Sequence, residues 1–94
     1  MEKRYYVYIL TNNSGTLYIG VTRNLDARNT QHKDKVNKGF TEKYNISKLI
    51  YYEVYQYIGD AIMREKQLKN WNRTKKLNLI RKINPTFKEI EIVD

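Results

Sequence analysis

Residues 17–32, LYIGVTRNLDARNTQH, decide how the first half of this chain is interpreted. The apolar and β-branched run LYIGVT is typical of a β-strand, and the polar segment after it opens with Asn24, a favourable N-cap residue. Asp26 falls in the first turn of the expected helix, where a negative charge is stabilising. The stretch therefore predicts a strand over 17–22 and then a helix over about 25–38.

Strand-like segments lie on both sides of this stretch. Residues 4–10, RYYVYIL, are rich in aromatic and β-branched side chains on both faces, which predicts a central strand or one covered by helices. The sequence TNNSGT at 11–16 has turn chemistry and would join this strand to 17–22 as an antiparallel hairpin. A third strand, LIYYEVYQY, is expected over 49–57.

Two helices are expected after the third strand. The first covers about 59–71, and the second covers about 74–83. The second stops before Asn84-Pro85, because the residue before a proline disfavours helical geometry. The predicted order is therefore β-β-α-β-α-α, in an α+β fold.

Length and composition bound the class of protein. Ninety-four residues provide one domain, 1–94, with a core over about 4–83 and a C-terminal tail over 84–94. Without cysteine no disulfide or thiolate metal site can form, and one histidine does not make a zinc cluster. No GxxxxGKS/T or GxGxxG loop is present, so no nucleotide cofactor is expected. No signal peptide or membrane-length apolar run is evident, so we expect a soluble cytoplasmic protein with no membrane partner.

The charge is strongly positive, at +8, and it is concentrated in one part of the chain. Between 59 and 82 the only acids are Asp60 and Glu65, whereas the closing EIEIVD is acidic. The basic residues of this region are Arg64, Lys66, Lys69, Arg73, Lys75, Lys76, Arg81 and Lys82. Solubility alone would explain the net charge, but clustering favours a nucleic-acid partner, and we expect the first six of these residues to contact it.

Glu65 does not suit a purely structural helix. On a helical wheel it falls in the middle of an apolar arc made by Ile58, Ala61, Ile62 and Leu68. An ionised carboxylate that faces a core is costly unless it is paired or bound to a cation. Glu65 is therefore either one half of a buried salt bridge, to a lysine or to Arg28, or a metal ligand or catalytic carboxylate in a cleft.

The first helix carries Arg28 and His32 four residues apart, on or beside its apolar stripe. A lone histidine there is commonly structural, but the pair suits a phosphate, because arginine offers a planar fork and histidine can donate or shuttle a proton. Tyr8 and Tyr18 lie on the two hairpin strands, and the short turn can bring them opposite one another. Periodicity leaves open which face of the sheet looks toward Glu65.

Taken in order, these residues resemble the motifs of the GIY-YIG nuclease superfamily. The set comprises Tyr6-Val7-Tyr8, Tyr18-Ile19-Gly20, Arg28, His32 and Glu65, and the resemblance runs from about 4 to 83. The chain is most similar to the small, single-domain bacterial branch. The resemblance implies a three-stranded antiparallel sheet flanked by helices.

The resemblance also implies a site and a reaction. Tyr8, Tyr18, Arg28, His32 and Glu65 would be catalytic, and Glu65 would bind a single Mg²⁺ or Mn²⁺ ion for hydrolysis of nucleic-acid phosphodiesters, with DNA favoured over RNA. Arg28 would offset charge on the phosphorus, a tyrosine would take a proton from water, and His32 would hold that tyrosine or the phosphate.

Three departures from the family pattern bear on this expectation. The first motif reads Tyr-Val-Tyr in place of Gly-Ile-Tyr, and Val21 stands where excision-repair relatives carry a lysine. A late asparagine of some members has two possible matches here, Asn70 and Asn72. The alternative function is a non-catalytic nucleic-acid-binding domain with the same fold, for which the basic region would suffice. A protein-interaction module explains neither the charge clustering nor Glu65.

Overall fold

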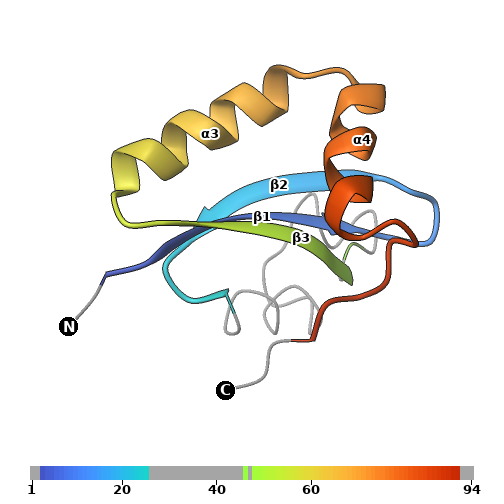
Figure 1. The fold of residues 1–94 in the computed structure, drawn as a ribbon, viewed down its shortest axis with the longest axis horizontal. Coiled ribbons are helices and arrows are strands. Elements are labelled where there is room, and N and C mark those ends of the chain that lie inside the picture. Colours follow the sequence, from blue (N-terminus) through green and yellow to red (C-terminus); the bar gives the residue numbers. More distant parts are fainter. Residues whose placement is uncertain (1–2, 26–45, 47, 92–94) are drawn as a thin grey trace.

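The computed structural model describes residues 3–25, 46 and 48–91, and these form one antiparallel sheet with two helices on one of its faces (Figure 1). The strands are β1 (Tyr5–Thr11), β2 (Leu17–Thr22) and β3 (Lys48–Tyr55), arranged in the order β2-β1-β3. The helices are α3 (Ile58–Asn70) and α4 (Arg73–Ile83). The predicted α+β fold and element order are confirmed, and β1 is the central strand. The helix expected over 25–38 lies, beyond Leu25, outside the described residues.

The turn between β1 and β2 is held by its own polar side chains. The Thr16 amide donates to Asn12 Oδ1 at 2.9 Å, and the Gly15 amide donates to the Asn12 carbonyl at 3.1 Å. Gly15 has φ +83°, a left-handed backbone that glycine adopts without strain. The Thr11 hydroxyl donates to the Thr16 carbonyl at 2.8 Å and closes the turn. This turn fixes the register in which Ile9 lies opposite Ile19.

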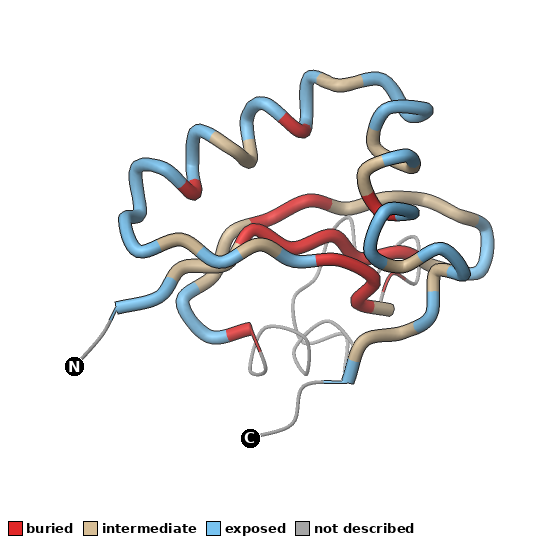
Figure 2. Tube along the Cα trace, in the orientation of Figure 1, coloured by how far each residue is buried: buried red, intermediate tan, exposed pale blue. Residues whose placement is uncertain are grey.

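Alternation along the strands divides the core into two clusters on opposite faces of the sheet. The helix-side cluster contains Val7, Ile9, Ile19, Ile50, Tyr51, Ala61, Leu68 and Ile80. The opposite cluster contains Tyr8, Leu10, Leu25, Ile46 and Leu49. Burial is accordingly concentrated along the strands and on the inner sides of the helices (Figure 2). Because both faces of β1 are buried, its sequence is apolar at nearly every position.

An irregularity in the pairing of β1 with β3 changes which residues of β3 face the helices. The register shifts between Ile9, which pairs with Tyr51, and Leu10, which pairs with Leu49. Ile50 is the additional residue, as in a β-bulge, and both Ile50 and Tyr51 join the helix-side cluster. From Tyr51 onward the odd-numbered residues of β3 face α3.

The segment after α4 is part of the folded structure as far as Ile90. Asn84 Nδ2 donates to the carbonyls of Ile50, at 2.9 Å, and Lys88, at 2.8 Å, while the Lys88 amide donates to Asn84 Oδ1 at 3.0 Å. The Ile90 amide donates to the Leu49 carbonyl at 2.7 Å. Residues 84–90 therefore run along the outer edge of β3, although the sequence predicted only a tail there. In the part of the chain that is described, no helix has the length and apolar character needed to span a membrane.

Candidate active site at the edge of strand β2

Tyr8 and Tyr18 lie on the same face of the sheet, the face opposite α3. In the register of the hairpin Tyr8 pairs with Gly20 and Leu10 pairs with Tyr18, so the two tyrosines are diagonal neighbours rather than directly opposed. Their ring centroids are 6.2 Å apart, and the rings are inclined by 37°. The prediction that the hairpin brings the two tyrosines opposite one another is therefore wrong in register by one residue pair on that face, although their rings are neighbours.

Gly20 provides the space that the ring of Tyr8 occupies. A Cβ atom at position 20 would lie 2.5 Å from the Tyr8 hydroxyl oxygen and 2.6 Å from Cζ. Contacts this short are forbidden, so the glycine of Tyr18-Ile19-Gly20 is required by packing rather than by backbone conformation. Tyr8 is 1% exposed, whereas Tyr18 is only half-buried. Of the two side chains, Tyr18 is therefore the more exposed.

Glu65 lies at the margin of the buried face of α3. Its side chain is 20% exposed and forms a salt bridge with Lys69 across one helical turn, with 3.3 Å between Oε2 and Nζ. The predicted apolar arc was wrong at two positions, because Ile58 and Ile62 are 44% and 38% exposed. The sequence left two interpretations of Glu65, a buried salt bridge or a metal-binding or catalytic carboxylate. The structure contains a salt bridge, with Lys69, but it lies at the surface rather than in the core.

The direction of Glu65 follows from its neighbour Arg64. Arg64 contacts Glu53 on β3, so that side of α3 lies over β3. Successive residues of a helix are turned by ~100°, which places Glu65 on the other side of the buried row formed by Ala61 and Leu68, toward β2. Glu65 is therefore on the side of α3 that is turned toward β2, an outer strand of the described sheet, while Tyr18 lies on the opposite face of the sheet.

Sequence analysis missed a polar cluster between β3 and α3. Glu53 accepts hydrogen bonds from the Tyr51 hydroxyl, from the Tyr55 hydroxyl at 2.6 Å, and from Arg64 Nε at 2.9 Å and Nη2 at 3.0 Å. Burial alone would raise the pKa of Glu53, but the hydrogen bonds from Arg64, Tyr51 and Tyr55 outweigh it and lower this pKa below its usual value. Burial, together with the hydrogen bond to Glu53, raises the pKa of Tyr55 to about 12. The signal was the alternation Tyr51-x-Glu53-x-Tyr55, which puts a carboxylate between two tyrosines on one face of a strand.

This cluster gives Arg64 a structural role. Besides Glu53, its Nη1 donates to Gln67 Oε1 at 2.7 Å, and its guanidinium carbon lies 5.1 Å from the ring centroid of Trp71. The guanidinium is thus occupied on several sides, and only 21% of the side chain is exposed. Arg64 packs α3 onto β3, so it is poorly placed to contact a phosphate.

The other basic residues predicted to contact nucleic acid lie on the outer surfaces of α3 and α4. Lys66, Lys69, Arg73 and Lys75 are exposed, and Lys76 is half-buried. Besides Lys69, which pairs with Glu65, two of them also make contacts within the fold. Arg73 Nη2 donates to the Gly15 carbonyl at 2.6 Å, and Lys75 Nζ lies 4.3 Å from the ring centroid of Trp71. These contacts leave the outer surfaces of both helices positively charged.

Arg28 and His32 lie outside the described residues, so their placement stays a prediction. Among the described residues no three carboxylate or imidazole side chains gather as a metal site. A single carboxylate is nevertheless compatible with Mg²⁺, which keeps several waters and shares oxygens with substrate phosphates. Glu65 fits that requirement, because its side chain is partly exposed and its partner Lys69 is 55% exposed and can turn away.

The chain is similar to known proteins in both sequence and fold. The model of the GIY-YIG catalytic domain matches residues 4–78, which is most of the chain. UPF0213 proteins of Staphylococcus aureus strains Mu3 and Mu50 are each 32% identical over 77 residues, which cover 82% of this chain and 94% of theirs. The solution structure of the UPF0213 protein BH0048 from Bacillus halodurans superposes with a TM-score of 0.58 at 23% identity, covering 90% of each chain, and so shares the fold.

The order of motifs, the tyrosine pair over Gly20 and the match over residues 4–78 lead to one family. The chain belongs to the GIY-YIG family, alongside the small UPF0213 proteins.

Proposed function

We propose that this protein is a divalent-metal-dependent endonuclease that hydrolyses phosphodiester bonds, and we take DNA before RNA as its substrate. Membership of the GIY-YIG family supports the nuclease class. The observation that carries the proposal is the tyrosine pair: Tyr8 of β1 packs against Gly20 and beside Tyr18 of β2 on one face of the sheet. Glu65 belongs to α3, which covers the other face.

Tyr18 is the proposed proton acceptor for the attacking water, because Tyr8 is buried and Tyr18 is not. An ordinary tyrosine has a pKa of about 10, so this role requires a cation or a water relay nearby. Arg28 is the proposed source of positive charge at the phosphate, and His32 is proposed to hold the tyrosine or the phosphate. Tyr8 is a positioning residue, since its ring supports that of Tyr18 from within the core.

Glu65 is the proposed ligand for one Mg²⁺ or Mn²⁺ ion. Bound there, the ion would polarise the scissile phosphate and stabilise the leaving oxygen. The salt bridge with Lys69 must open for this, but a surface pair one helical turn apart contributes only ~0.3–0.5 kcal/mol. A divalent cation with a phosphate would therefore compete readily with Lys69 for the Glu65 carboxylate. Lys69 would then be free to contact the nucleic acid.

Nucleic acid is proposed to lie across α3 and α4 toward the β2 edge. Lys66, Lys69, Arg73, Lys75 and Lys76 supply the positive charge, and Arg64 is left out because Glu53 holds it. Each phosphate that a lysine or arginine neutralises releases counterions, so affinity should fall steeply as salt rises.

A non-catalytic nucleic-acid-binding domain is the second candidate. One observation favours it: Glu65 already has a cationic partner in Lys69 and needs no metal ion for its charge to be compensated. Val21, at the position of a lysine in excision-repair relatives, points the same way. In this case the basic surface would be kept and cleavage would be absent.

The deciding experiment is incubation with labelled branched, single-stranded and double-stranded DNA and with RNA, with and without Mn²⁺. Glu65→Gln is the test variant, and Glu91→Gln is its control, because it makes the same chemical change at an exposed residue of the C-terminal segment. An enzyme should cleave only with metal, lose cleavage in Glu65→Gln and keep it in Glu91→Gln. Binding without cleavage under every condition would establish the second candidate, and absence of binding at low salt would remove both.

A further inference from the structure

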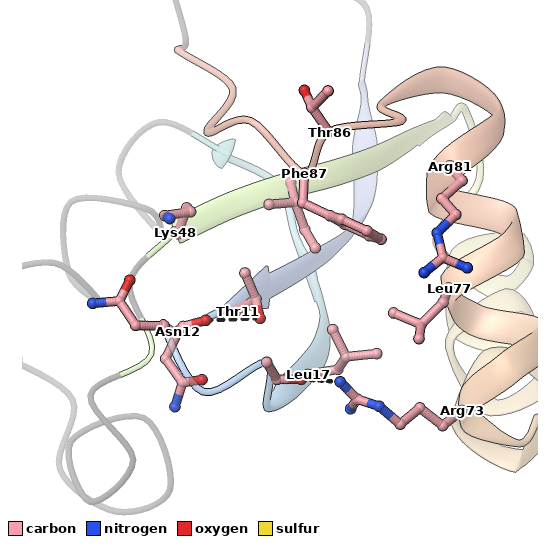
Figure 3. A pocket seen from close by; sticks show the side chains of 12 residues that line it. Thr11, Asn12, Leu17, Lys48, Arg73, Leu77, Arg81, Thr86 and Phe87 are labelled. Atoms are coloured by element: carbon pink, nitrogen blue, oxygen red, sulfur yellow. Dashed lines mark hydrogen bonds between the residues drawn. The ribbon is translucent and has the colours of Figure 1, made fainter.

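A pocket of about 390 Å³ opens at the end of the sheet where the β1–β2 turn lies (Figure 3). The turn, the start of β3, helix α4 and the segment after α4 all contribute to its walls. The volume is within the range of ligand pockets, ~300–1,000 Å³. Of the residues named as catalytic, the three that the structure describes, Tyr8, Tyr18 and Glu65, do not line this pocket.

The lining is divided by chemistry into an apolar wall and a polar rim. Leu17, Ile50, Leu77 and Phe87 form the wall, and the ring of Phe87 is directed toward α4 (Figure 3). Three cations from three different parts of the chain form the rim: Lys48, Arg73 and Arg81. Asn12, Asn13, Thr11 and Thr86 add hydrogen-bonding groups, and no acidic side chain is among the described lining residues.

The positions of Arg73, Arg81 and Phe87 are set by the fold. Arg73 is anchored to the Gly15 carbonyl, and the Arg81 guanidinium carbon lies 5.5 Å from the ring centroid of Phe87. Phe87 closes a turn in which its amide donates to the Asn84 carbonyl at 3.2 Å, and its φ of +54° is rare for a residue with a side chain. The aromatic ring and the two arginines are thus held at the pocket before any ligand arrives.

We propose that this pocket holds one unpaired nucleotide of the nucleic-acid substrate, with its base on the apolar wall and its phosphate at the cationic rim. An aromatic face beside apolar side chains suits the face of a base, and arginine forks suit phosphate oxygens. A base inside a duplex cannot reach such a wall, so the pocket selects single-stranded ends, gaps or flaps. This inference rests on the proposed function and adds the form of the substrate to it.

The pocket is next to the proposed active site along β2. Leu17 lines the pocket and Tyr18 follows it, so their side chains point to opposite faces of the same strand end. A nucleic-acid strand with one unpaired nucleotide in the pocket would continue past the edge of β2, toward Tyr18. Cleavage is therefore expected close to the junction of single-stranded and double-stranded nucleic acid.

The test compares binding, by fluorescence anisotropy without metal, to a blunt duplex and to the same duplex with a short single-stranded overhang. The wild-type protein should bind the duplex with the overhang about 5-fold more tightly or better, because stacking of one base on an aromatic ring contributes that much to affinity. Phe87→Leu keeps the apolar bulk without the aromatic face, and Arg81→Gln removes a rim cation; both should lose the preference. Lys82→Gln is the matched control, since it removes a charge next to Arg81 from a residue outside the pocket. Thermal midpoints identify a variant that fails to fold, and Arg81→Gln, at an exposed residue, then decides alone.

Each outcome separates the inference from the proposed function. A preference that survives in Phe87→Leu and Arg81→Gln, or that Lys82→Gln also abolishes, would overturn the pocket assignment while nucleic-acid binding stands. A wild-type protein that binds both duplexes equally would do the same. A free mononucleotide that competes as strongly as the overhang would show a small-molecule site instead of a strand site. No binding to either duplex would remove the proposed function itself.

Discussion

Replacement of Gly20 by alanine tests the packing of the tyrosine pair directly. The new Cβ would lie 2.5 Å from the Tyr8 hydroxyl oxygen, 2.6 Å from Cζ and 3.0 Å from Cε1. The ring of Tyr8 is fully buried and sits against Leu10 and Leu25, so it has little room to retreat. Overpacking of this kind typically costs ~1–3 kcal/mol.

The expected loss is large enough to measure by thermal unfolding. In a domain of this size 1 kcal/mol shifts the midpoint by ~4–8 °C, so Gly20→Ala should unfold at least several degrees below the wild type. Gly59→Ala is the matched control: it makes the same chemical change in α3, where a Cβ would meet nothing within 4 Å. Because alanine favours a helix over glycine, Gly59→Ala should leave the midpoint unchanged or raise it, by up to ~1 kcal/mol in stability.

The same variant links the packing to the proposed chemistry. If Tyr8 supports Tyr18, displacement of the Tyr8 ring in Gly20→Ala should also lower the rate of cleavage at a temperature where the variant is folded. A Gly20→Ala protein that unfolds within a degree of the wild type would refute the placement of the Tyr8 ring across Gly20. A stability loss in Gly59→Ala equal to that in Gly20→Ala would show that alanine is costly for reasons other than this contact.

Four further outcomes are expected. Glu53→Gln removes the counter-charge of half-buried Arg64 and should cost ~1.5–3 kcal/mol in urea unfolding. The pKa of Glu53 is lowered in the folded state, so its ionised carboxylate stabilises the fold at pH values above the ordinary glutamate pKa. This stabilisation is lost as the pH falls through the pKa that Glu53 has in the folded protein. The wild type should therefore lose stability in acid more steeply than Glu53→Gln. Glu65→Gln should abolish metal-dependent cleavage yet shift the thermal midpoint by less than ~4 °C, since only the surface pair with Lys69 is lost; a larger shift would mean that Glu65 is a structural residue. Asn84→Ala removes the hydrogen bonds that hold 84–88 to β3 and should cost ~1–3 kcal/mol and speed proteolysis of the C-terminal segment, and an unchanged proteolysis rate would contradict the anchoring role.

The strands, helices and turn could be predicted because their signals are local. TNNSGT supplies its own turn hydrogen bonds, and Pro85 ends α4 through its effect on the residue before it. Apolar side chains on both faces of β1 predicted either a central strand or one covered by helices, and the structure places β1 at the centre of the sheet. The short turn also predicted that Tyr8 and Tyr18 would be close, but the exact register, in which Tyr8 pairs with Gly20, could not be read from the sequence.

The contacts that sequence analysis missed depend on partners distant in the chain. A helical wheel gives the direction of each side chain but not the identity of what it meets, so it could not show that Arg64 reaches Glu53, eleven residues earlier. Nor could the wheel show that only Ala61 and Leu68 of α3 are buried, with Ile58 and Ile62 left exposed. The bulge at Ile50 was equally invisible, since it arises only from the pairing of β3 with β1.

The outer edges of β3 and β2 differ in whether another described segment covers them, and this difference bears on where a substrate could bind. The edge of β3 is occupied by the C-terminal segment, through the hydrogen bonds of Asn84 and Ile90 to Ile50 and Leu49. Within residues 3–25, 46 and 48–91 no strand pairs with the outer edge of β2. An exposed edge is a liability for aggregation, and proteins commonly cover it or charge it. An open edge is useful where a phosphate backbone must come between side chains from both faces of one strand, as the proposed roles of Tyr18 and Glu65 require. Among the described residues the edge of β3 is covered and the edge of β2 is not, so a substrate bound at the proposed site would approach along β2.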